Sequence, residues 1–437
     1  MPIVTLLVPG NFVMAALLTG VFHLPKDIYG WVVSLPFWGN FAQAFLLPLV
    51  QRRLAPKAVA VTAAWLQLVC WGAVAVALPW LPTDHPQAAG RWFLLIGAFS
   101  AAVSAFTVVG WSSWVQEWVP PRLRGRYFGR RNRLLQLSTI AFLALAGSMI
   151  DLERPDGSVR AFQILIGAAV LLRIVSALAQ EGIHAAEGHA LAETATPWRE
   201  QIAVLARTPA FLWFVAFGAV WGFAANCFGP FYYVFLYEQI HFSVREVALL
   251  VILVSVGGVL SYPAWGVLAH RLGNKPVILF CLLAWQVQNY LWCFITPENS
   301  WLLWFMWTFG GMMVAGLVLG LFNIQLTIIP PAAKTLAISV NLAVTALVTA
   351  LAPIAGGWVL ARYLTPAHDA LAIYHAVFLV QPTLAILACL LLARVHEPEA
   401  RPLASVVGAM RNIRTLSGVL GLGFLADHVF YPPSRKR

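Results

Sequence analysis

The chain has 437 residues, of which 60% are hydrophobic and 10% are charged, and its formal net charge is +11. Charged residues make up about a quarter of an ordinary soluble domain, so this composition excludes a soluble globular protein and indicates an integral membrane protein. The basic residues gather in short stretches between apolar runs, as expected beside anionic lipid. This distribution argues against a nucleic-acid-binding protein.

Twelve apolar runs are predicted to cross a membrane, since a crossing needs about 20 mostly apolar residues. They lie at residues 3–23, 28–50, 57–80, 91–117, 134–150, 161–180, 209–236, 245–269, 276–296, 300–327, 335–362 and 371–393. We therefore expect an all-α membrane protein with two six-helix, pseudo-symmetric bundles. The predicted parts are a first bundle (1–180), a cytoplasmic linker (181–208), a second bundle (209–394) and a cytoplasmic tail (395–437).

The linker is predicted to contain a short amphipathic helix around Trp198 to Ala206. The five cysteines lie in or beside apolar runs and lack the paired spacing of a metal site or a disulfide framework. We therefore expect no metal and no cofactor.

The most basic stretch lies between the fourth and fifth apolar runs, and it contains six arginines and no acid. They are Arg122, Arg124, Arg126, Arg130, Arg131 and Arg133. Positively charged loops resist translocation, so we interpret this stretch as a cytoplasmic loop. Both termini are then cytoplasmic, and most of the 28 Lys and Arg residues fall on that side. The expected location is the inner cell membrane, crossed many times.

Two loops of the first half recur in the second half of the chain. Pro120-Pro121 correspond to Pro330-Pro331, and Arg53 and Lys57 correspond to Arg271 and Lys275. Duplicated halves are common in transporters, so the sequence predicts an internal repeat.

The loop between the eighth and ninth runs resembles the hallmark loop of the major facilitator superfamily, whose pattern is G-x-L-x-D-R-x-G-x-[RK]. The matching residues are Gly266, Leu268, Arg271, Gly273 and Lys275, while His270 stands where the family has aspartate. The first copy keeps only the basic positions, Arg53 and Lys57, with Gln51 at the acid position. In the family this aspartate helps to latch the two halves. The resemblance implies a transporter whose central cavity is lined by the first, fourth, seventh and tenth helices.

On the predicted fourth helix, hydroxyl and indole side chains recur at steps of three and four residues and so share one face. Ser104, Thr107 and Trp111 are the candidate solute ligands on this face. Hydroxyls and indoles suit the polar and apolar sides of a small molecule. Close helix packing by small residues and an interfacial aromatic belt are the alternative interpretation.

The other three cavity helices carry further candidates. Asn226 and Tyr233 share a face of the seventh helix with Gly222 and Gly229, beside Pro230, which permits bending. A structural hydrogen bond between helices is the alternative role for Asn226. The remaining candidates are Asn11 on the first helix and Trp304, Thr308 and Asn323 on the tenth helix.

Arg173 lies inside an apolar run, and two roles are open for it. Its side chain either extends to the cytoplasmic headgroups or binds an anion. The 17 acids fall in loops or at helix ends, which leaves no carboxylate at mid-membrane depth to relay protons. We therefore expect a secondary transporter for a neutral or weakly polar solute, sugar-like or metabolite-like. Efflux of amphipathic compounds is the alternative.

A polytopic membrane enzyme is the alternative from another class. The sequence lacks a D-x-D motif and a G-x-x-x-x-G-K-[ST] phosphate loop, so we expect neither enzymatic activity nor ATP-driven transport. Arg411 and Arg414 lie one turn apart in the moderately apolar tail, which predicts an amphipathic helix on the membrane surface. We expect a monomer whose partners are the lipid bilayer and a small-molecule solute.

Overall fold

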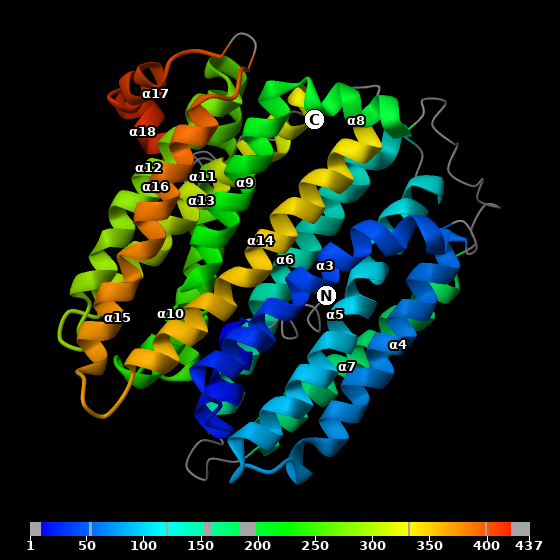
Figure 1. The fold of residues 1–437 in the computed structure, drawn as a ribbon, viewed down its shortest axis with the longest axis vertical. Coiled ribbons are helices and arrows are strands. Elements are labelled where there is room, and N and C mark those ends of the chain that lie inside the picture. Colours follow the sequence, from blue (N-terminus) through cyan, green and yellow to red (C-terminus); the bar gives the residue numbers. More distant parts are fainter. Residues whose placement is uncertain are drawn as a thin grey trace, which may run out of the picture. The chain divides into compact units, whose positions relative to one another are not determined.

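The computed structural model describes residues 10–51, 55–118, 121–152, 159–183, 198–330, 333–397 and 400–420. Within these ranges every regular element is a helix (Figure 1). Nine of the described helices are long and apolar enough to cross a membrane, and two shorter apolar helices lie at Phe12–Val21 and Leu137–Asp151. An all-helical membrane protein is therefore confirmed, while the total of twelve crossings stays a prediction.

The helices of the first half are α2 (Phe12–Ala15) with the π-helical η1 (Ala16–Val21), α3 (Lys26–Gln51), α4 (Pro56–Ala77) with η2 (Leu78–Trp80), α5 (Pro86–Trp118), α6 (Pro121–Leu152) and α7 (Arg160–Glu181). The later helices are α8 (Trp198–Ala206), α9 (Pro209–Cys227), α10 (Phe231–Glu238), α11 (Val244–Leu272), α12 (Asn274–Asn289) with η4 (Tyr290–Phe294), α13 (Leu302–Ile328), α14 (Lys334–Tyr363), α15 (Ala370–Phe378), α16 (Val380–Ala393), α17 (Leu403–Met410) and α18 (Ile413–Val419). Helix α8 confirms the amphipathic helix predicted in the linker.

The arginine-rich stretch is helical, so its interpretation as a loop was wrong. Helix α6 begins at Pro121 and includes Arg122, Arg124, Arg126, Arg130, Arg131 and Arg133. Proline is favourable in the first turn of a helix, and arginine is among the better helix formers. The apolar part of the helix begins only at Leu137, which is why hydropathy alone placed the start of the helix too late.

Two compact units are present, and they do not follow the two sequence halves. Unit 1 contains residues 1–195, 226–248 and 339–373, and unit 2 contains residues 196–225, 249–338 and 374–437. Unit 1 therefore combines helices of the first half with α10, the start of α11 and most of α14. The predicted division at residues 180, 208 and 394 describes the sequence repeats and stays a prediction.

Three glycines bring the backbones of α3, α9 and α14 into contact in unit 1. A Cβ atom added at Gly30 would lie 2.3 Å from the carbonyl oxygen of Pro353. One added at Gly356 would lie 1.8 Å from the carbonyl oxygen of Cys227. A Cβ atom added at Gly357 would lie 2.4 Å from the carbonyl oxygen of Lys26. Small residues of this kind allow membrane helices to approach closely, so segments of the two sequence halves pack here without intervening side chains.

Two equivalent lysines cap the ends of two equivalent helices. Lys57 Nζ donates hydrogen bonds to the carbonyl oxygens of Glu181 (3.0 Å) and Ile183 (2.7 Å), at the end of α7. Lys275 Nζ donates to those of Ala393 (2.6 Å) and Val395 (2.8 Å), at the end of α16. The last carbonyls of a helix lack partners within the helix and favour cations. The two lysines matched by the sequence repeat therefore have the same structural role.

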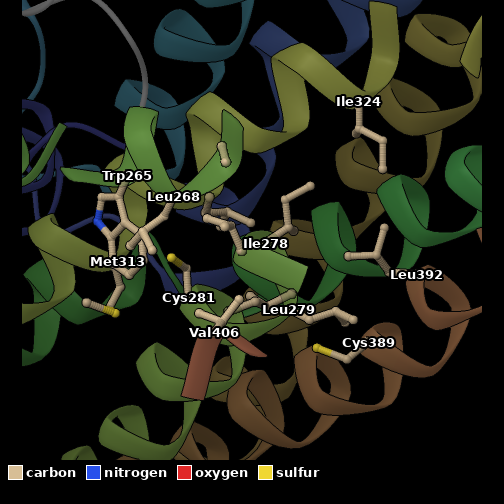
Figure 2. Close-up of a cluster of buried hydrophobic side chains, with 14 of the residues drawn as sticks. Trp265, Leu268, Ile278, Leu279, Cys281, Met313, Ile324, Cys389, Leu392 and Val406 are labelled. Atoms are coloured by element: carbon tan, nitrogen blue, oxygen red, sulfur yellow. The ribbon is translucent and has the colours of Figure 1, made fainter. Parts of the chain in front are cut away.

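The core of unit 2 includes part of the tail. Val406 of α17 is fully buried in a cluster with Leu279 and Cys281 of α12 (Figure 2). The tail residue Glu397 is 8% exposed and caps the start of α12. Its carboxylate accepts hydrogen bonds from the backbone N–H of Asn274 (3.0 Å) and Lys275 (2.7 Å) and from Asn274 Nδ2 (2.8 Å).

Arg173 is buried within the protein, and its extension to the cytoplasmic headgroups stays a prediction. Its side chain is buried, at 6% exposure, on the face of α7 that also buries Ala169 and Ala177. Its Nε and Nη2 atoms have no hydrogen-bond partner among the described residues. Anion binding by Arg173 stays a prediction.

We expect Gly356→Ala to lower the apparent melting temperature of the purified protein, because its new methyl group overlaps the carbonyl oxygen of Cys227. Overpacking of this kind costs about 1–3 kcal/mol. Gly167→Ala on α7 is the matched control, since a Cβ atom there has no neighbour within 4 Å. Equal melting temperatures for the two variants would contradict the close packing.

Candidate functional site

The hydroxyl groups of α5 bind partners within unit 1. Ser104 Oγ accepts a hydrogen bond from Gln67 Nε2 of α4 at 2.8 Å, and Ser100 Oγ accepts one from Trp71 Nε1 at 2.8 Å. Thr107 Oγ1 donates to the carbonyl oxygen of Val103 at 3.0 Å. Ser104 therefore joins α5 to α4, which supports the alternative that this part of the face packs helices together.

Trp111 is paired with an arginine from the next helix. The guanidinium carbon of Arg131 lies 3.9 Å from the centroid of the Trp111 ring, and both side chains are half-buried. A cation over the face of an indole is attracted by the ring quadrupole. Arg131 lies nearly three turns past Pro121 in the continuous helix α6. The interpretation of this stretch as a loop did not predict that position.

The first and seventh predicted helices meet at α2 and α10. Asn11 caps α2, because its Oδ1 atom accepts a hydrogen bond from Val13 N at 2.9 Å. The rings of Phe12 and Tyr233 lie 6.4 Å apart between centroids, and Tyr237 Oη donates to the carbonyl oxygen of Phe12 at 3.0 Å. Asn11 and Tyr233 are thus on neighbouring segments of unit 1. Asn226 is half-buried near the end of α9.

The candidates on the predicted tenth helix belong to unit 2. Trp304, Thr308 and Asn323 lie on α13 and are half-buried. Thr308 Oγ1 donates to the carbonyl oxygen of Trp304 at 2.8 Å. The structure thus places Asn11, Ser104, Thr107, Trp111, Asn226 and Tyr233 in unit 1 and the other three candidates in unit 2.

An ion pair in unit 1 joins α3 to α10 at the ends of both helices. Lys26 Nζ pairs with Glu238 Oε1, and these side chains are 15% and 34% exposed. One turn further along α3, Tyr29 Oη donates to the carbonyl oxygen of Pro230 at 3.3 Å. The sequence places Glu238 among the acids at helix ends but does not reveal its partner, which is 212 residues away.

A second contact between the two sequence halves lies at the start of α11. The carboxylate oxygens of Asp151, at the end of α6, accept hydrogen bonds from Val244 N and Arg245 N, both at 3.1 Å. Negative charge stabilises the N-terminus of a helix. The predicted topology puts these residues, like Lys26 and Glu238, on the outer side of the membrane.

The hallmark loop lies at the junction of α11 and α12. Gly273 has φ +96° and contacts the tail, since an added Cβ atom would lie 2.9 Å from Cα of Ala400. His270 and Arg271 are exposed at the end of α11, and a Cβ atom at Gly266 would meet no neighbour within 4 Å. Arg53 lies outside the described residues. The acid bound at this loop is Glu397 from the tail, which the hallmark pattern does not include.

Comparison with known proteins identifies relatives of this architecture. Residues 219–430 match the model of the Major Facilitator Superfamily. The crystal structure of a mutant of the nucleoside transporter NupG superposes with a TM-score of 0.69 at 15% identity, covering 91% of this chain and 98% of that one. The inward-open structure of the xylose transporter XylE from E. coli superposes with a TM-score of 0.65 at 13% identity. The match covers 93% of this chain and 98% of that one. No curated protein sequence matches this chain.

A third structure, a bacterial homologue of the iron transporter ferroportin in an inward-facing state, gives a TM-score of 0.67 at 15% identity. The match covers 90% of this chain and 97% of the ferroportin homologue. The family match and the shared fold agree with the hallmark-loop residues at α11 and α12.

Exchanging the charges of the ion pair tests its role. We expect Lys26→Glu and Glu238→Lys each to lower solute flux in proteoliposomes, because each single variant places like charges together. The double exchange should restore most of the flux, since it recreates the pair in reverse. A double variant no better than the single variants would contradict a direct interaction. Glu298→Gln, at a fully exposed loop residue, serves as the charge control.

Proposed function

Since this chain belongs to the major facilitator superfamily, we propose that it is a secondary transporter that moves a small organic solute across the inner cell membrane by alternating access. The observation that carries the proposal is the set of contacts in unit 1 between the two sequence halves. They lie at one end of the helices concerned and consist of an ion pair, a carboxylate cap and close glycine packing. Such contacts can separate without unfolding either helix.

The proposed solute is neutral or weakly polar, sugar-like or metabolite-like. The candidate ligands offer amides, hydroxyls and rings rather than carboxylates, and Arg131 adds N–H donors beside Trp111. Guanidinium donors suit hydroxyl and carbonyl oxygens. Structures of this fold include proteins named as nucleoside and xylose transporters, which supports a small polar solute.

Efflux of amphipathic compounds is the second candidate function. The rings of Phe12 and Tyr233 lie close together in unit 1, and an aromatic wall would also suit the apolar side of an exported compound. Neither candidate requires a chemical change of the solute, so we propose no enzymatic activity. The proposed protein is a monomer with both termini in the cytoplasm.

We expect Trp111→Ala and Asn226→Ala each to raise the apparent KM for the transported solute by about tenfold, the effect of losing about 1.4 kcal/mol of binding. The measurement is solute flux into proteoliposomes, after thermal unfolding has shown that each variant is folded. Trp358→Ala is the matched control, because Trp358 of α14 is 65% exposed. An unchanged KM in both site variants would refute this solute site.

The orientation is tested by labelling single cysteines in a cysteine-free background. A cysteine at Gly125, in the arginine-rich part of α6, should react with an impermeant reagent only after the cells are opened. A cysteine at Gly157, between the predicted fifth and sixth crossings, should react in intact cells. The reverse pattern would place the termini outside.

A further inference from the structure

A groove on unit 2 lies between α12, α13 and the tail helix α17. Its volume is about 620 Å³, and nine of its ten lining residues are apolar. Val287, Phe305 and Val407 in its walls are 63%, 59% and 41% exposed. Large apolar side chains this exposed on membrane-spanning helices face lipid, and the tail contributes one wall through Leu403 and Val407.

The groove lies at the middle depth of the crossing formed by α12 and η4. Its wall on α12 and η4 extends from Phe280 to Leu291, a rise of about 16 Å along the helix axis. The hydrocarbon core of a bilayer is about 30 Å thick, so each leaflet contributes about half of that. The whole crossing extends from Asn274 to Phe294, so the groove begins about two turns inside its predicted cytoplasmic end and continues past the middle of the bilayer.

The tail beside the groove is positively charged. Arg401 and Arg411 flank α17 and are exposed, and residues 400–420 contain no acid. The nearby carboxylate of Glu397 is buried and already accepts three hydrogen bonds from α12. Arg401 lies beside the end of α11, since its backbone N–H donates to the carbonyl oxygen of Leu272 at 2.9 Å, and Glu399 is the nearest acid to it in the sequence.

We propose that the groove between α12, α13 and α17 binds an anionic phospholipid of the cytoplasmic leaflet. One acyl chain lies along Phe280 to Leu291, and the phosphate lies beside Arg401 and Arg411. Cations near the membrane surface attract anionic headgroups, and the acyl chain packs against the apolar walls of the groove. The tail helix is then held by protein on one face, through Val406, and by lipid on the other, through Val407.

Native mass spectrometry of the purified full-length protein tests this site, with phosphatidylglycerol and phosphatidylcholine as probes. We expect the protein to retain about tenfold more phosphatidylglycerol than phosphatidylcholine, because two arginines attract the anionic headgroup. Arg401→Ala/Arg411→Ala should reduce the retention of phosphatidylglycerol to that of phosphatidylcholine. Arg207→Ala is the matched charge control, since Arg207 is exposed in the predicted linker and remote from the tail in sequence.

Filling the groove tests the acyl-chain part of the proposal. Val407→Trp and Ala284→Leu fill it from the tail and from α12, and each should reduce the retention of both lipids. Val318→Trp, at a half-exposed position of α13 that does not line the groove, should leave retention unchanged. Thermal unfolding shows which variants are folded. Unchanged retention in folded groove variants, or an equal loss in the Val318 control, would overturn the proposal.

Discussion

Direct backbone contact between the two sequence halves is the constraint on which unit 1 depends. Gly30, Gly356 and Gly357 let α3 and α14 approach each other and the end of α9 so closely that any side chain would overlap a carbonyl oxygen. This approach brings the start of α3 beside the end of α10, where Lys26 meets Glu238. The same packing places Tyr29 against Pro230. In the proposed transporter, these short contacts at helix ends would close the solute path on this side, and small helix movements would open it.

Charges at helix ends provide the second organising feature, and most come from distant parts of the chain. Lys57 and Lys275 cap the last carbonyls of α7 and α16, while Asp151 and Glu397 cap the first N–H groups of α11 and α12. Each contact satisfies backbone groups that have no partner within their own helix. The acid that caps the start of α12 comes from the tail, while His270 stands at the aspartate position of the hallmark pattern. The contact of Glu397 ties the tail to the junction of α11 and α12.

Local sequence features predicted the helices but could not identify the contacts between residues that are distant in the sequence. The apolar runs, the helix at Trp198–Ala206 and the correspondence of Lys57 with Lys275 all follow from patterns within a few turns or from the repeat. Hydropathy missed the first turns of α6 because arginine is unfavourable in lipid yet forms helices well. It also could not show that Arg173 is covered by its neighbours or that Ser104 binds Gln67. The pairing of Lys26 with Glu238 required the fold, since no local signal links residues so far apart.

The proposed alternating-access transport requires the contact between α3 and α10 to open in each cycle. The most direct measurement is solute flux in proteoliposomes after Lys26→Cys and Glu238→Cys have been joined by a short, reducible cross-linker in a cysteine-free background. We expect the cross-link to form readily and to stop solute flux, and we expect reduction of the linker to restore the flux. Undiminished flux through fully cross-linked protein would contradict the proposed opening of this contact.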